Sequence, residues 1–196
     1  MEGKGCRILT EPGRLRTWAA TLLAAAGVSG PVRATGAELS GVRSTSPGIR
    51  ELIDDAMWES PTFRGIVRAI AASDGIVYVD QGVCGHGVHS CLRLDVTPAA
   101  GYRILHILVD REGVLARRGR LELIATIGHE LSHALEVLGE RTIQSGAAMY
   151  LFYVHKAPTS NTSFETAAAI AAGAAVRREL GRHVTFVFEQ VALDFR

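Results

Sequence analysis

The 196-residue sequence contains no uninterrupted apolar run of the roughly 18 to 20 residues that a transmembrane helix needs. It also lacks a marked excess of charge of either sign, because 21 basic residues are balanced by 20 acidic ones. The first absence argues against an integral membrane segment. A hydrophobic fraction of 47% predicts instead one compact domain with a well-buried core.

The first 36 residues have the order of a secretory signal peptide. Basic residues come first, the apolar run WAATLLAAAGV (18–28) follows, and the small-residue stretch RATGAELS (33–40) comes last. This order predicts a signal peptide over 1–36, with cleavage near Gly36 or Ala37, and a single domain over 37–196 that is exported to the periplasm or secreted. The alternative is an ordinary N-terminal core helix.

Loss of such a leader would change the charge balance only slightly. Five basic and two acidic residues lie in 1–36, which leaves 16 basic and 18 acidic residues and a net charge of −2. A domain without a positive excess has no electrostatic basis for binding nucleic acid or an anionic membrane. We therefore expect no nucleic-acid partner.

Cysteine is scarce, with three residues in the chain, of which Cys6 lies in the expected leader. Cys84 and Cys91 lie close together in the segment CGHGVHSC. In an oxidising compartment this spacing predicts a local disulfide, and two free buried thiols are the alternative. The histidines of the same segment do not form a cluster with standard zinc spacing.

The N-terminal half of the domain has helical patterns followed by strand patterns. A helix is expected over 49–58, and a second runs from Ser60, as its N-cap, to a stop at Gly75. Strand-like runs follow over 76–80, 91–96 and 102–110. Their short connections predict an antiparallel meander, with the Cys84–Cys91 loop in its first hairpin.

The C-terminal half returns to helical periodicity. Helices are expected over 121–138, from about Ser145, and over 164–180, before a final strand over 184–193. The whole order predicts an α+β domain with a small antiparallel sheet.

The segment IGHELSHALEVL (127–138) carries the most specific motif, H-E-x-x-H on a helix. Residues four apart lie on one face of a helix, so His129 and His133 can both direct a ring nitrogen at one metal ion. Glu130 projects beside that ion, where its carboxylate can act as general base. Zinc lowers the pKa of a bound water towards about 7, so this combination suits hydrolysis at neutral pH. The alternative is a core helix with two histidines by chance.

A catalytic zinc needs a third protein ligand and keeps one position open. The extended pattern H-E-x-x-H-x-x-G-x-x-H is absent, since Glu136 and Gly139 stand where it needs glycine and histidine. A metzincin arrangement is therefore not expected. Downstream, SFETAAAIAAGAAVRREL places Glu165 at the start of an alanine-rich helix that can pack closely on the motif helix.

With these segments the sequence resembles the gluzincin branch of the zincin metallopeptidases. It resembles in particular a group of bacterial exported proteins that share SPTFR, IVYV, IGHEL-HALEV and FET-AA segments. The resemblance implies a zincin-like fold, Zn²⁺ held by His129, His133 and Glu165, and Glu130 as base. It also implies an edge strand that aligns an extended peptide, for which 102–109 is the candidate.

Several residues near the motif have two interpretations. Glu165 also ends the segment TSFE (162–165), a capping-box pattern in which it would bond back to Thr162 and hold no metal. Tyr153 and His155 could donate to a developing oxyanion, or be a packed tyrosine and a surface histidine. Glu136 and Glu140 are expected to be solvated charges on the motif helix.

The function expected is that of an exported zinc-dependent hydrolase, a peptidase that acts on a peptide or protein substrate. One alternative is a non-catalytic exported domain with no metal, or with structural zinc and His155 as a fourth ligand. A second is a peptide deformylase, in which Cys91 would join the two motif histidines as a ligand.

Overall fold

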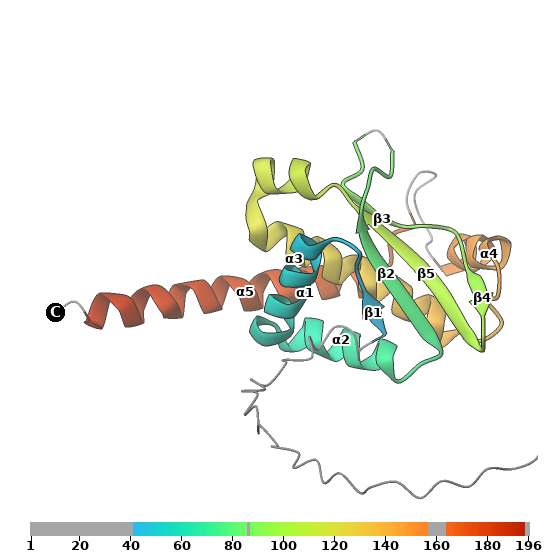
Figure 1. Cartoon of the computed structure of the whole chain (residues 1–196), viewed down its shortest axis with the longest axis horizontal. Coiled ribbons are helices and arrows are strands. Elements are labelled where there is room, and N and C mark those ends of the chain that lie inside the picture. The colour runs from blue at the N-terminus through green and yellow to red at the C-terminus, as the bar shows by residue number, and fades with distance from the viewer. Residues whose placement is uncertain (1–40, 86, 157–163, 195–196) are drawn as a thin grey trace, which may run out of the picture. The chain divides into compact units, whose positions relative to one another are not determined.

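The computed structural model describes residues 41–85, 87–156 and 164–194, and side chains as far as residue 182. The signal peptide expected over 1–36 lies outside the described residues. The described chain is an α+β domain with a five-stranded mixed sheet and five helices. Its elements are labelled in Figure 1.

Three strands of the sheet run parallel to one another. They are β1 (Val42–Arg43), β2 (Gly75–Gln81) and β5 (Tyr102–Val109), in that spatial order. Two three-residue strands, β3 (Ser90–Leu92) and β4 (Thr97–Ala99), pair antiparallel with β5. β5 therefore lies in the interior of the sheet (Figure 1).

The predicted antiparallel meander is wrong, because β5 lies between β2 and β3 and runs parallel to β2. The prediction of 102–109 as an edge strand is wrong for the same reason. Both sides of β5 carry apolar residues, and one set, Leu105, Ile107 and Val109, is fully buried. The interior place of β5 follows from the pairing of β2 along one edge and of β3 and β4 along the other. The shorter and more polar β3 is left at the edge.

Helices α1 (Pro47–Glu59) and α2 (Pro61–Ala71) precede β2, close to their predicted positions. Ser60 caps α2 as predicted, since its hydroxyl oxygen accepts a hydrogen bond from the Phe63 N–H at 3.0 Å. A second contact supports this helix end. The Glu179 carboxylate accepts hydrogen bonds from the Thr62 N–H at 3.1 Å and the Thr62 hydroxyl at 2.7 Å.

The motif helix belongs to α3 (Arg111–Gly139), which has a kink at Gly119. Gly119 has φ 82° and ψ 176°, a conformation that favours glycine. The segment after the kink corresponds to the predicted helix over 121–138. The segment before it is an additional helix that sequence periodicity did not predict. The next helix, α4 (Gly146–Lys156), begins after Ser145 as predicted.

The last helix, α5 (Ala167–Asp194), includes the residues predicted to form a final strand, so that prediction is wrong. The alternation of apolar residues over 184–188 resembles a strand, but no proline interrupts the chain after Ala167. Extending an existing helix adds one hydrogen bond for each residue that is ordered. Helix propagation therefore prevails over the local strand pattern.

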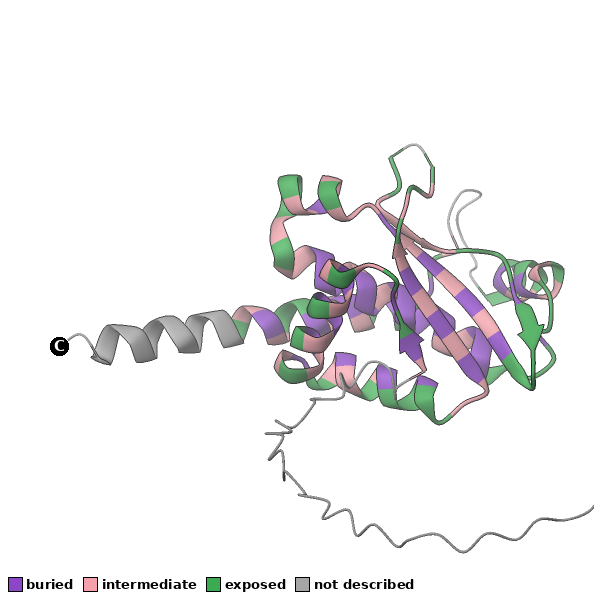
Figure 2. Ribbon diagram, in the orientation of Figure 1, coloured by how far each residue is buried: buried purple, intermediate pink, exposed green. Residues whose placement is uncertain are grey.

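The core lies between one face of the sheet and the helices. Buried and partly buried residues alternate along β2 and β5, as Figure 2 shows, and the buried face contacts α2 and α3. α5 packs in turn against α3 and α2. None of the helices in the described ranges is both long enough and apolar enough to cross a bilayer.

A buried arginine holds the end of the motif helix against the sheet. Arg103 is 1% exposed and donates hydrogen bonds to four carbonyl oxygens at and beyond the C-terminus of α3. These belong to Val137, Leu138, Glu140 and Ile143. Two further bonds, of 2.6 and 3.0 Å, reach the Asp74 carboxylate. The last carbonyls of a helix have no partner within the helix, and Arg103 supplies one.

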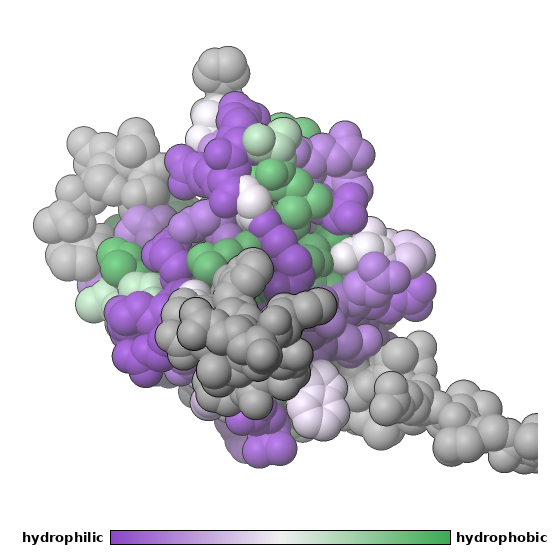
Figure 3. Space-filling view, turned by 90° about the vertical axis from the view of Figure 1, so that its left-hand side faces the viewer, coloured by the Kyte–Doolittle hydropathy of each residue, from purple (hydrophilic) through white to green (hydrophobic). Residues whose placement is uncertain are grey.

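One face of the molecule and one ion-pair cluster show the character of the surface. Hydrophilic side chains predominate on the face shown in Figure 3, with hydrophobic ones in smaller groups between them. Arg120 links α3 to α1 through Asp55, at 2.6 Å, and Glu59, at 3.2 Å. Ion pairs as exposed as these contribute little to stability.

Candidate metal centre

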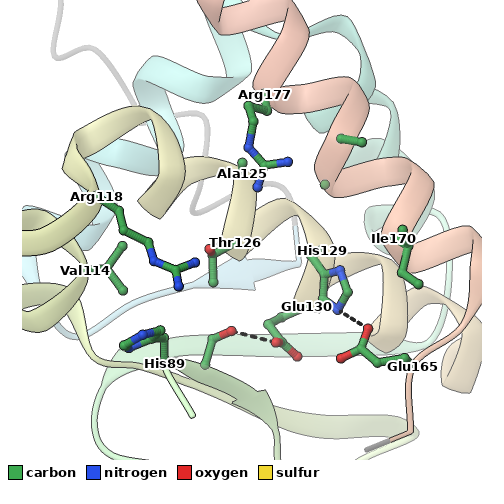
Figure 4. Close-up of a pocket in the computed structure, with 13 residues that line it drawn as sticks. His89, Val114, Arg118, Ala125, Thr126, His129, Glu130, Glu165, Ile170 and Arg177 are labelled. Atoms are coloured by element: carbon green, nitrogen blue, oxygen red, sulfur yellow. Dashed lines mark hydrogen bonds and ion pairs between the residues drawn. The ribbon is translucent and has the colours of Figure 1, made fainter. Parts of the chain in front are cut away.

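Three side chains converge between α3 and the start of α5. Their ligand atoms, from His129, His133 and Glu165, all lie within 4.8 Å of one another, and the group could hold a metal ion. The His129 Nε2 atom lies 3.1 Å from Oε2 of Glu165 (Figure 4). The two histidine rings come from successive turns of α3, with centroids 4.8 Å apart. Glu165 lies 32 positions after His133 in the sequence, so this group depends on tertiary contact.

Close packing of the two helices brings Glu165 to the histidines. A Cβ atom on Gly173 of α5 would lie 3.2 Å from the His129 Cβ, and one on Gly128 of α3 would lie 3.0 Å from the Val176 side chain. Distances this short leave little room for a larger side chain at either position. The glycines and alanines of α5 therefore have a steric role beside the ligand group, as the alanine-rich sequence suggested.

The start of α5 does not match the capping-box interpretation of Glu165, because the N-cap is Thr166; Thr162, to which Glu165 would bond back, lies outside the described residues. The Thr166 hydroxyl accepts a hydrogen bond from the Ala169 N–H at 3.2 Å, and its carbonyl accepts one from the Ile170 N–H at 3.1 Å. Glu165 precedes the cap, and about half of its side chain is exposed. Its carboxylate is directed at His129, with Oε2 3.1 Å from Nε2.

A carboxylate holds the second histidine in position. The His133 Nδ1 atom lies 3.2 Å from Oε2 of Glu136, one turn further along α3. When Nδ1 carries the proton and donates it to Glu136, Nε2 is left as the ligand atom. Lys156 of α4 approaches the same carboxylate, with its Nζ atom 3.6 Å from Oε1.

The expectation for Glu136 is therefore wrong, since this side chain is only 9% exposed. The i to i+3 spacing from His133 was the available clue, because residues three apart are neighbours on a helix. Glu140 is exposed, as expected.

Glu130 lies between the histidines and the edge of the sheet, and it is 6% exposed. Its Oε1 atom accepts a hydrogen bond from the Ser90 hydroxyl at 2.6 Å, and Oε2 accepts one from the Leu92 N–H at 2.8 Å. Both donors belong to β3. A carboxylate has about four acceptor positions, so each oxygen can still accept one more proton or hydrogen bond. Ser90 had no recognisable pattern in the sequence.

Tyr153 packs behind His133 and is 2% exposed. Its hydroxyl donates a hydrogen bond to the His133 carbonyl at 2.9 Å, and the two rings meet edge to face with centroids 5.6 Å apart. Burial, with the charges of Glu136 and Glu130, raises the Tyr153 pKa far above its ordinary value, so the hydroxyl keeps its proton. Of the two interpretations of Tyr153, an oxyanion donor or a packed tyrosine, this arrangement matches the packed tyrosine. His155 is exposed on α4 and is not part of the ligand group.

The disulfide prediction is confirmed, since Cys84 and Cys91 are bonded across a Cα–Cα distance of 5.9 Å. The bond joins the preceding loop to β3, the strand that contacts Glu130. A disulfide sulfur is not a thiolate, which is the form of cysteine that binds zinc. The deformylase alternative therefore loses the Cys91 ligand on which it depends.

Two cavities open on either side of the ligand group, and both are lined by Ser90, Glu130 and Glu165. One, of about 310 Å³, extends past His129 towards Thr126 and the arginines of α3 and α5 (Figure 4). The other, of about 200 Å³, extends past His133 and has a largely apolar lining: Val88, Leu92, Leu94 and Phe164. The group thus lies in an open site, where a larger molecule could reach it from both sides. Comparison of the chain with family models, curated proteins and solved structures found no match.

Proposed function

We propose that this protein is a zinc-dependent hydrolase that cleaves peptide bonds, with a zincin-like site of the gluzincin kind. The observation that carries the proposal is the convergence of His129, His133 and Glu165 beside the buried carboxylate of Glu130. Two imidazole nitrogens and one carboxylate oxygen are a ligand set found in catalytic zinc sites.

The number of ligands supports a catalytic site over a structural one. A structural zinc is enclosed by four protein ligands, whereas a catalytic zinc has three and keeps a position for water or substrate. Three ligand residues form the group within the described part of the chain, and the cavities on both sides leave it accessible. Zinc held there would act as a Lewis acid that activates water and polarises a carbonyl group.

The residues of the chain then have separate tasks in hydrolysis. Glu130 accepts the proton that water loses as its oxygen attacks the carbonyl carbon. Glu130 then transfers this proton to the amine nitrogen as the C–N bond breaks. Ser90 and Leu92 hold the carboxylate in one orientation through the two hydrogen bonds from β3. Glu136 keeps the Nε2 atom of His133 available as a ligand.

β3 replaces 102–109 as the candidate for aligning an extended peptide. It is an edge strand of the sheet, and it borders both cavities through Ser90. An exposed edge can add a peptide as a further strand. The disulfide beside β3 also supports an oxidising compartment, which fits export of the protein.

The second candidate function is that of a non-catalytic exported domain, with structural zinc or no metal. The observation that favours it is the pair of hydrogen bonds from β3 to Glu130, which gives this residue a structural role. Against structural zinc, His155 does not join the ligand group as a fourth member.

Zinc content and peptide cleavage test the proposal together. The purified protein should contain about one zinc per chain by elemental analysis, and Glu165→Ala should lose most of it. Glu140→Ala, a control at the exposed C-cap residue that follows α3, should keep its zinc. The parent should cleave peptides from a mixed library analysed by mass spectrometry, and Glu130→Gln should bind zinc without cleaving them. Zinc-loaded parent protein that cleaves no peptide would support the non-catalytic domain.

A further inference from the structure

We propose that the cavity beside His129, the His129-side cavity, binds a carboxylate group of the substrate, and that Arg118 is the residue that holds it. This inference rests on the proposed function, because it names the class of peptide that the site accepts. The substrate would carry either a free C-terminal carboxylate or an acidic side chain in this cavity, and an apolar side chain in the cavity beside His133.

The kink in α3 places Arg118 at this cavity. Gly119 ends the first helical segment with its positive φ of 82°, and Arg118 is the residue before it. In Figure 4, the Arg118 side chain extends towards Thr126, and both residues line the cavity that His129 also lines. The kink therefore brings a cation from one segment of α3 into the same cavity as a motif residue of the other.

Two arginines line this cavity, and Arg118 is the one whose positive charge is not neutralised by an ion pair with another described residue. Arg177 also lines the cavity, but it forms a two-point ion pair with Glu122, at 2.6 and 2.8 Å. The hydrogen bonds from Arg177 are the largest cause of the lowered pKa of Glu122. Arg118 also lowers this pKa, but only through its charge and without a hydrogen bond. Among the described residues, Arg118 has no ion pair or hydrogen bond to an acidic side chain. An arginine in this state can bind a carboxylate through two parallel hydrogen bonds.

The surrounding charges make this position specific for the carboxylate. Glu130 and Glu165 lie where the two cavities meet, and a bound Zn²⁺ would offset their two negative charges, so Arg118 is, in the part of the chain that the structure describes, the unpaired cation that distinguishes one cavity from the other. Within the described ranges, no lysine or arginine lines the cavity beside His133. A peptide with one carboxylate and one apolar side chain therefore has a single favourable direction across the ligand group. The His129-side cavity, at about 310 Å³, is near the lower limit for ligand pockets, which suits one end of a short peptide.

Matched peptides test this assignment. One pair would differ only in a C-terminal carboxylate or amide, and a second pair only in an internal glutamate or glutamine. The parent should cleave the anionic member of at least one pair roughly tenfold more efficiently in kcat/KM, as one charge-assisted contact predicts. Preference in the first pair identifies the chain terminus as the ligand, and preference in the second identifies the acidic side chain.

Two arginine variants separate the local contact from net charge. With Arg118→Gln, the ratio of kcat/KM between the anionic and the neutral peptide should fall to about 1, mainly because KM for the anionic peptide rises. Arg117→Gln removes the same charge from the neighbouring residue, which is 65% exposed and faces Asp110 at 3.7 Å, and it should keep the preference. Cleavage with no carboxylate preference, or a preference that survives Arg118→Gln, would overturn the assignment while leaving the proposed hydrolase in place.

A binding measurement keeps the two proposals distinct when no peptide is cleaved. The zinc-loaded Glu130→Gln protein would be titrated with the same fluorescent peptides, with and without Arg118→Gln. Tighter binding of the anionic peptide that disappears with Arg118→Gln supports the carboxylate site independently of turnover. Equal binding of both members of each pair refutes it.

Discussion

The His133 Nδ1 atom lies 3.2 Å from the Glu136 carboxylate, and both side chains are more than nine-tenths buried. Water therefore has little access to this contact, and Glu136 sets which ring nitrogen of His133 carries the proton. A residue one turn beyond the motif thus prepares one of its two histidines for a metal ion. The same carboxylate faces Lys156 from α4, so two helices contribute to the arrangement.

Replacing Glu136 should weaken zinc binding without removing a ligand. Glu136→Gln keeps the shape but loses the charge that orients the His133 ring, and we expect zinc affinity to fall by about 10- to 100-fold. Competition with a chelator of known affinity measures the change. Glu140→Gln is the matched control, because it removes the same charge from the exposed C-cap residue that follows α3. Equal affinities in the two variants would show that Glu136 has no such role.

The close approach of α5 to α3 should be sensitive to side-chain size at Gly173. Gly173→Val adds three carbon atoms at a position where even a single added Cβ would lie 3.2 Å from the His129 Cβ. We expect the free energy of unfolding to fall by about 1 to 3 kcal/mol. We expect zinc affinity to fall by a larger fraction of its parent value, because Glu165 moves away from the histidines. Chemical denaturation and zinc competition would be measured on the same samples.

Gly181 provides the control for that experiment. It lies in the same helix, and a Cβ atom there would meet nothing within 4 Å. Gly181→Ala should leave zinc affinity unchanged and stabilise the protein by roughly 0.5 to 1 kcal/mol, because alanine favours a helix. If Gly173→Val bound zinc as tightly as Gly181→Ala did, close packing would not be what positions Glu165.

Arg103 should be among the residues on which folding depends most strongly. Arg103→Met leaves four carbonyl oxygens at the end of α3 without their donor, at a cost of about 3 kcal/mol in unfolding free energy. Asp74 adds less to this cost, because 38% of its side chain is exposed and water can replace the arginine. Urea denaturation measures the effect. Arg93→Met, at an arginine with 52% exposure, should change stability by less than about 0.5 kcal/mol.

Glu179 should make folding stability depend on pH. Burial alone would raise the pKa of this carboxyl, but hydrogen bonds from Ser60 and Thr62 outweigh it, so the folded-state pKa is below the ordinary value. The stabilisation is therefore fully present above the unfolded-state pKa of about 4.3, and it is lost as pH falls through the folded-state pKa.

Comparison with a neutral variant isolates this contribution. Glu179→Gln should be less stable than the parent by about 1 kcal/mol at pH 7, and the difference should shrink as pH falls from 5 to 3. Urea denaturation at several pH values tests this. A difference that stays constant over that range would mean that the charge of Glu179 does not contribute.

Features that depend on neighbours in sequence were predictable. The helical spacing of His129 and His133, the Ser60 cap and the pairing of Cys84 with Cys91 each involve residues within a few positions of one another. Local geometry alone decides such features. The proximity of Glu165 to the motif was expected only through resemblance to a family, and the structure brings these residues together.

The remaining features depend on contacts between distant segments. β5 lies inside the sheet because β2 and β3, from different parts of the chain, pair with its two edges, whereas each strand-like run looked equally suited to a meander. Glu136 is buried and faces Lys156 of α4, and residues 184–193 are helical because α5 continues past its alanine-rich part. Side-chain periodicity records which face of an element is apolar, and it does not record which partner covers that face. The sequence by itself thus determined the α+β class and the H-E-x-x-H helix, while the tertiary structure decided the strand order and the environment of Glu130.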